Sequence, residues 1–119
     1  MNALTLFLLL IPGAYLVGAV PWGFLIGKWS RGVDVRSTGS GSTGSSNVLR
    51  SIGAKQAALV LLLDIAKGTA AVMTARVLAD VADLTSLQTS YLEMASGLAA
   101  LVGHNWPIYL KFKGGRGVA

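Results

Sequence analysis

The residues best suited to chemistry lie in a polar, glycine-rich segment, residues 36–50, that separates two long apolar runs. Glycine lets the backbone turn tightly and bring its N–H groups close to a ligand, while serine, threonine and asparagine add hydroxyl and amide donors. The segment has no acidic residue, begins with Arg36 and ends with Arg50. This composition is typical of a phosphate-binding loop. We predict contacts to such an anion from Gly39, Ser40, Gly41, Gly44, Ser46, Asn47 and Arg50.

The end of this segment is predicted to start a helix, because the apolar residues Val48, Leu49 and Ile52 follow directly. A helix N-terminus offers free N–H groups and the positive end of a dipole to a phosphate. The glycine spacing at 39, 41 and 44 also fits the dinucleotide-binding fingerprint, but that fingerprint requires a preceding strand in a soluble βαβ unit. A flexible glycine–serine linker would leave Asn47 and the flanking arginines unexplained.

A second polar stretch, residues 103–117, combines a histidine with cations and glycines. Histidine has an unperturbed pKa of about 6.5, so His104 could act as a base, although on residue type alone a position at the membrane interface is favoured. The cations could attract anionic lipid, each contributing about 1 kcal/mol. Their glycine-rich setting favours a specific phosphate site instead. The residues predicted to form it are Lys111, Lys113, Gly114, Gly115 and Arg116.

Between these stretches lie Asp64 and Lys67, which are three residues apart in an apolar run. At that spacing two side chains share one face of a helix and can pair. An unpaired charge is costly at membrane depth. We therefore predict a mutually satisfied ion pair inside the helix bundle and prefer this interpretation to a catalytic role.

The composition of the chain indicates a membrane protein. Of its 119 residues 53% are hydrophobic and only 13% charged, with a mean hydropathy of +0.62, whereas soluble domains carry about 25% charged residues. The net charge of +5 does not indicate nucleic acid binding, because no basic face with interleaved aromatic residues is present. The chain has no cysteine, which excludes disulfides and thiolate metal sites. We expect one transmembrane domain, with neither metal nor cofactor.

Three membrane spans are predicted, giving an all-α polytopic helix bundle. The first covers residues 3–27 and should be kinked or interrupted at Pro12 or Pro21, the second covers residues 54–78, and the third covers residues 91–102 with residues 86–90 as its outer turn. Positive charges gather in residues 28–55 and again after residue 103. By the positive-inside rule both glycine-rich stretches face the cytoplasm and the N-terminus lies outside.

The motifs together resemble the acyl-phosphate-dependent glycerol-3-phosphate acyltransferase family, usually called PlsY. The resemblance lies in Gly-Ser-Gly-x-x-Gly-x-x-Asn-Val-x-Arg at 39–50, Asp-x-x-Lys-Gly at 64–68 and Gly-His-x-x-Pro followed by Phe-Lys-Gly-Gly-Arg-Gly up to 117. It implies a bacterial inner-membrane enzyme that opens phospholipid synthesis, with acyl phosphate and glycerol 3-phosphate as substrates. A partner enzyme that supplies the acyl phosphate is also implied. The family's bundle has seven helices, so we expect residues 1–119 to be a C-terminally incomplete part that is inactive alone.

The resemblance also implies roles for the residues. The loop at 39–47 would hold the phosphate of the acyl phosphate, while Arg50 and the later cations would grip glycerol 3-phosphate. Ser40 and His104 would orient or deprotonate the attacking hydroxyl, although the acyl phosphate could itself serve as the base. A covalent acyl-serine formed through a Ser40–His104 pair ranks lower. The alternative from another class is a phosphate or organophosphate transporter fragment whose polar loops line a pathway.

Overall fold

The computed structural model describes residues 2–110, and within them every regular element is a helix. This confirms the predicted all-α fold. The α-helices are α1 (Ala3–Gly18), α2 (Trp22–Arg31), α3 (Ser45–Ser51), α4 (Ala54–Val81) and α5 (Ser86–Asn105). Two short 3-10 turns, η1 (Val35–Ser37) and η2 (Ile108–Leu110), follow α2 and α5 respectively.

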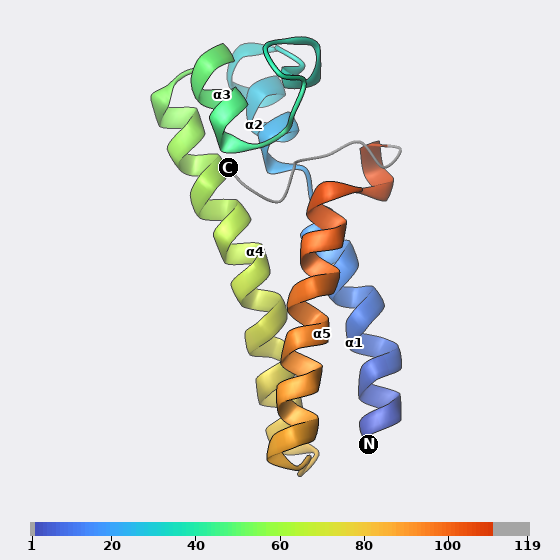
Figure 1. Ribbon diagram of the computed structural model, residues 1–119. Helices are drawn as coiled ribbons and strands as arrows, with labels where there is room; N and C mark the ends of the chain where they lie inside the picture. The colour runs from blue at the N-terminus through green and yellow to red at the C-terminus, as the bar shows by residue number, and fades with distance from the viewer. Residues whose placement is uncertain (1, 111–119) are drawn as a thin grey trace.

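The long helices α1, α4 and α5 lie side by side, and α2 and α3 gather at one end of them (Figure 1). The chain runs along α1 to that end, returns through α4 and comes back through α5, so α5 packs against both α1 and α4. The end of α5 therefore lies at the same end of the bundle as the glycine-rich segment. This arrangement brings the start of the second polar stretch, residues 103–110, to the same end of the bundle as the first.

Two helical stretches, Ala3–Arg31 and Ala54–Val81, are long and apolar enough to cross a membrane, with mean hydropathies of 2.2 and 1.7. They correspond to the first two predicted spans. The third predicted span, residues 91–102, falls within α5, which also includes residues 86–90. Within residues 2–110 α5 is not among the stretches apolar enough to qualify, so the third span stays a prediction. At 1.5 Å per residue the 20 residues of α5 extend about 30 Å, which is the thickness of a hydrocarbon core.

The predicted interruption of the first span occurs between α1 and α2. The helix continues through Pro12 but stops at Gly18, and α2 begins at Trp22. Pro21 in the break has no N–H to donate, so a helical hydrogen bond at this point is impossible. Backbone carbonyls near the break are therefore left without their helical partners and are available to other elements.

Small residues let α5 approach α1 closely. A Cβ atom added to Gly18 would overlap the backbone carbonyl of Ala100, and one added to Gly103 would overlap the carbonyl of Tyr15. Close contact of this kind is the usual way in which helices associate where no hydrophobic driving force acts between them. The Tyr15 hydroxyl also donates a 2.6 Å hydrogen bond to the backbone carbonyl of Trp106. The position of His104 relative to α1 is thereby fixed.

Candidate active site

Asn47 holds the glycine-rich segment in shape. Its side chain is only 1% exposed, and its Oδ1 accepts from the Ser40 N–H at 3.1 Å and from the Ser51 hydroxyl at 3.3 Å. Its Nδ2 lies 2.9 to 3.0 Å from three backbone carbonyls, those of Val35, Thr38 and Ser42. The amide is thus fully used within the protein. This favours a positioning role for Asn47 over the predicted direct contact with an anion.

Two glycines of the segment adopt backbone conformations that other residues rarely reach. Gly39 has φ 51° and Gly41 has φ 77°, both in the left-handed region. A Cβ atom on Gly39 would overlap Asn47 Oδ1, and one on Gly41 would lie 3.1 Å from the carbonyl oxygen of Arg36. The expectation that glycine is needed here for tight turning is therefore confirmed.

Arg36 stabilises the start of the segment. Its guanidinium makes two hydrogen bonds of 2.9 to 3.0 Å with the carboxylate of Asp34 and lies 4.6 Å from the ring centre of Phe24. The bond from Arg36 holds the pKa of the Asp34 carboxyl below its ordinary value of 3.8. Asp34 also caps η1 by accepting from the Arg36 N–H. Arg36 is thus occupied within the protein.

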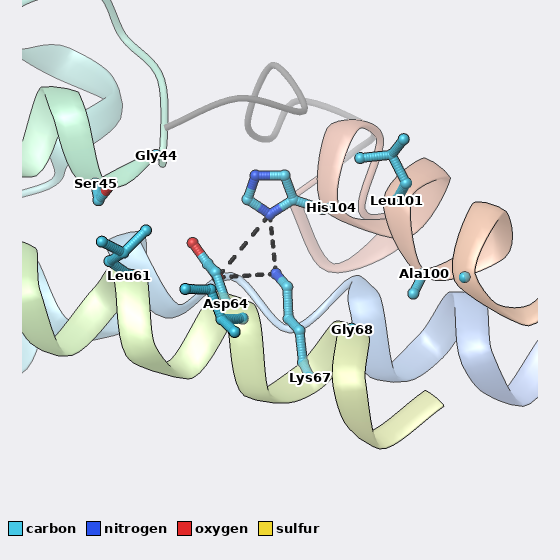
Figure 2. Close-up of a pocket in the computed structure, with 11 residues that line it drawn as sticks. Gly44, Ser45, Leu61, Asp64, Lys67, Gly68, Ala100, Leu101 and His104 are labelled. Atoms are coloured by element: carbon cyan, nitrogen blue, oxygen red, sulfur yellow. Dashed lines mark hydrogen bonds and ion pairs between the residues drawn. The ribbon is translucent and has the colours of Figure 1, made fainter. Parts of the chain in front are cut away.

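A cavity of about 300 Å³ opens where α4, α5 and the start of α3 meet. Figure 2 shows Asp64 and Lys67 on α4, His104 reaching toward them from α5, and Gly44 and Ser45 at the other side of the view. Much of the remaining wall is apolar or small. That part consists of Leu61, Ile65, Gly68, Gly97, Ala100 and Leu101.

The predicted pair of Asp64 and Lys67 is confirmed, with 3.0 Å between Asp64 Oδ1 and Lys67 Nζ. Two further groups contact this ion pair through Lys67. Lys67 Nζ lies 3.0 Å from His104 Nδ1 and 3.0 Å from the backbone carbonyl of Val20 in the α1–α2 break. His104 Nδ1 is 4.0 Å from Asp64 Oδ1. A buried charged cluster therefore lines the cavity and includes the predicted catalytic histidine.

The structure brings together only part of the predicted site. Gly44 and His104 line the same cavity, while Ser46 is half-buried at the start of α3 and Arg50 is exposed farther along it. Ser40 is exposed, lies outside the cavity wall and makes no hydrogen bond to His104 in the described structure, so the pair needed for an acyl-serine is not formed. The predicted residues Lys111, Lys113, Gly114, Gly115 and Arg116 lie outside the described residues.

Two members of the cavity wall were not singled out as site residues from the sequence. Ser45, only 8% exposed, lines the cavity as the first residue of α3 and was predicted only as one member of the 39–47 loop. Lys67 was predicted only as the partner of Asp64, and its contact with His104 depends on how α5 packs on α4. Within residues 2–110, no three metal-ligating side chains come together.

Comparison with known proteins shows what this chain is similar to. Residues 8–119 match the sequence profile of a family described as glycerol-3-phosphate acyltransferase. A glycerol-3-phosphate acyltransferase from Synechococcus sp. (strain CC9605) is 46% identical over 112 residues, which cover 94% of this chain and 51% of the relative. One from Gloeobacter violaceus (strain ATCC 29082 / PCC 7421) is 47% identical over 106 residues, covering 89% of this chain and 50% of the relative.

Two solved structures are also similar. The glycerol 3-phosphate form of PlsY (YgiH), an integral membrane glycerol 3-phosphate acyltransferase, superposes with a TM-score of 0.77 at 35% identity, covering 93% of this chain and 52% of that one. Its lysophosphatidic acid form gives a TM-score of 0.74 at 34% identity, with 93% and 50% covered. The chain thus spans about half the length of the relatives it matches, and its helices form part of a membrane bundle.

Proposed function

Because the chain belongs to the glycerol-3-phosphate acyltransferase family, we propose that it acts in transferring an acyl group from acyl phosphate to the 1-hydroxyl of sn-glycerol 3-phosphate. The products would be lysophosphatidic acid and inorganic phosphate. The observation that carries this proposal is the cavity at which the glycine-rich segment, through Gly44 and Ser45, meets His104 beside an apolar wall. A polar end for phosphate and an apolar wall for a hydrocarbon chain are what an acyl phosphate requires.

The acyl group passes directly from one bound phosphate compound to the other. The 1-hydroxyl oxygen of glycerol 3-phosphate attacks the acyl carbon, and a new ester bond forms. The bond from the acyl carbon to the phosphate oxygen breaks, its electron pair leaves with the phosphate, and the hydroxyl proton is taken up by that phosphate. No external base is required by this balance, because the leaving phosphate carries basic oxygens.

Different described residues would contact the acyl chain and the phosphate of the acyl phosphate. The apolar wall, with small residues Gly68, Gly97 and Ala100, leaves room for an acyl chain between α4 and α5. The start of α3 would face the acyl-phosphate group. Several amides of the segment are already used, since the N–H groups of Ser40, Gly41 and Gly44 bond within the loop. Ser45 is therefore the more direct candidate for phosphate contact.

Arg50 is proposed to hold glycerol 3-phosphate, together with the cations after residue 110. Its side chain is exposed on α3 and forms no ion pair with any residue in 2–110. Arginine binds phosphate through two parallel hydrogen bonds, which fixes orientation as well as charge. We place the reaction at the cytoplasmic face of a bacterial inner membrane, where an enzyme that makes acyl phosphate would supply the donor.

The proposal is tested by an acyl-transfer assay in detergent. Since the chain spans about half of its relatives, the assay uses a chimera in which residues 1–119 replace the matching part of the Synechococcus sp. (strain CC9605) relative. Conversion of glycerol 3-phosphate to lysophosphatidic acid, dependent on acyl phosphate, is the expected result. Uptake of glycerol 3-phosphate into vesicles without transfer would instead support the transporter alternative.

Two variants of this chimera should fail in different ways. Arg50→Ala removes charge-assisted hydrogen bonds of about 1.5–3 kcal/mol, so the KM for glycerol 3-phosphate should rise roughly ten- to a hundredfold with little change in kcat. Gly41→Val places a branched side chain at φ 77° and should lower turnover with acyl phosphate. An unchanged KM in Arg50→Ala would contradict this assignment. Wild-type turnover in a correctly inserted Gly41→Val protein would contradict the role of the loop.

A further inference from the structure

The ammonium group of Lys67 has a complete set of acceptors. It carries three N–H donors, and three acceptors lie 3.0 Å from Nζ: Asp64 Oδ1, the Val20 carbonyl and His104 Nδ1. The side chain of Lys67 is 7% exposed, so water supplies little alternative. Each donor of the lysine thus has one partner within the protein, and one of these partners is the histidine.

This geometry fixes where the proton of His104 sits. Nδ1 accepts from the ammonium, so it cannot carry a hydrogen of its own, and a neutral imidazole must then carry its hydrogen on Nε2. A protonated ring would place an N–H donor and a second positive charge against Nζ at 3.0 Å. Asp64 lies 4.0 Å from Nδ1 and 3.0 Å from Nζ, which makes its carboxylate the partner of the lysine.

We infer that Lys67, held by Asp64 and Val20, locks His104 as a neutral imidazole with its proton on Nε2, so that His104 donates a hydrogen bond into the site and is not its general base. In Figure 2 the second ring nitrogen of His104 points away from the lysine. Asp64 and Lys67 are the charged groups that face the ring from α4. The break between α1 and α2 contributes the Val20 carbonyl, and the start of α3 contributes the uncharged Ser45. Lys67 is then a positioning residue.

The use of this donor rests on the proposed function. In the view of Figure 2, His104 lies between Gly44 and Ser45 on one side and Ala100 and Leu101 on the other. An acyl phosphate laid along the cavity would therefore place its carbonyl group beside the ring. Negative charge develops on that oxygen when the hydroxyl attacks, and an N–H aimed at it would stabilise the transition state. The proton of the hydroxyl would leave with the phosphate.

Nuclear magnetic resonance on the 119-residue chain in detergent micelles tests the proton position directly. His104 is the single histidine of the chain, so its ring ¹⁵N signals need no assignment by mutation. We expect the Nε2–H pattern to persist from about pH 8 to about pH 5, a range in which an ordinary histidine with a pKa of about 6.5 becomes protonated. The Nδ1–H form, or protonation with a midpoint near or above 6.5, would overturn the inference.

Two variants test whether Lys67 is what keeps the ring of His104 in the neutral Nε2–H form. Lys67→Met leaves Asp64 as the nearest charge, so His104 should become protonated within the same pH range. If that protein does not fold, the double variant Asp64→Asn, Lys67→Met removes both charges together and should restore an ordinary titration. A ring that stays locked in the Nε2–H form in the folded variants would show that the lysine does not hold it.

The role in the reaction is tested in the chimera with two replacements of the histidine. Glutamine can place an amide N–H near the position of Nε2, whereas asparagine reaches only the position of Nδ1. Loss of one donor to a developing oxyanion typically lowers kcat about 10²- to 10³-fold. We expect His104→Gln to stay within about tenfold of the parent, with the same pH profile, and His104→Asn to lose about 100-fold. Equal losses of kcat in the two variants would refute the donor role of His104. An unmutated chimera without activity would refute the proposed function, and the proton position would then be tested by the ¹⁵N spectra alone.

Discussion

Replacing Asn47 with alanine is expected to open the glycine-rich segment while leaving the long helices in place. The substitution removes the bonds to four backbone groups, the carbonyls of Val35, Thr38 and Ser42 and the N–H of Ser40. A hydrogen bond contributes a net 0.5–1.5 kcal/mol on average. Val35 is completely buried, so its carbonyl would lose most, whereas the exposed Ser40 can bond to water.

The sum of these four losses is about 2–6 kcal/mol, which corresponds to an increase of about 30- to 20,000-fold in the fraction of molecules with an open segment. Limited trypsin cleavage after Arg36, followed by mass spectrometry, measures this fraction, because the protease needs an extended chain at that bond. The cleavage rate should rise by a similar factor. The detergent-solubilised protein should keep its helix content.

Ser37→Ala is the matched control. It removes only the 2.7 Å hydrogen bond from the Ser37 hydroxyl to the Asp34 carbonyl, in an exposed setting within the same segment. Its effect should stay within about 0.5 kcal/mol, as for most surface substitutions. A cleavage rate for Asn47→Ala within threefold of that control would refute the argument that this one buried amide holds the segment.

Three further outcomes are expected. Gly103→Ala should lower the melting temperature in detergent, because the added Cβ would overlap the Tyr15 carbonyl. The control Gly13→Ala has no atom within 4 Å of its added Cβ and should be neutral or up to about 1 kcal/mol stabilising; equal melting temperatures of the two variants would contradict this packing. The pKa of the Asp34 carboxyl, followed in a ¹³C spectrum, should lie below 3.8 and should rise again in Arg36→Gln. Because the pKa is lowered in the folded protein, the stability that this carboxylate contributes is present at neutral pH and is lost as the pH falls through the folded pKa. Since the chain has no cysteine, Ser42→Cys should be labelled only from the cytoplasmic side and Asp83→Cys from outside, and labelling of both from one side would refute the proposed topology.

The helices and their order could be predicted because apolar runs of this length have few alternatives. The second span was predicted as residues 54–78 and forms α4 at Ala54–Val81. The ion pair within α4 followed from a fixed helical spacing of three residues. The polar segment was identified as a tight glycine-rich loop from Gly39 and Gly41, whose positive φ angles only glycine adopts readily.

The rest depends on contacts that no local pattern encodes. Asn47 was predicted to bind a ligand because asparagine is a good donor, but its buried amide serves the loop backbone instead. Ser40 and His104 were considered as a pair, yet His104 is held by Lys67, 37 residues away in the sequence. Which donor faces a substrate and which faces the protein is decided by packing between helices, so residue type alone could not distinguish them.

The break between α1 and α2 lowers the stability of the helix but provides a backbone acceptor for Lys67. Substituting Pro21 with a good helix former would let one continuous helix form, a change that commonly increases stability. The Val20 carbonyl now accepts from the Trp22 N–H at 3.1 Å and from Lys67 Nζ at 3.0 Å. In a continuous helix it would accept the N–H of Phe24 at helical geometry, and this bond would compete with Lys67. A chain engineered for heat resistance at this point would gain a helical turn and weaken the contact that holds Lys67 beside His104.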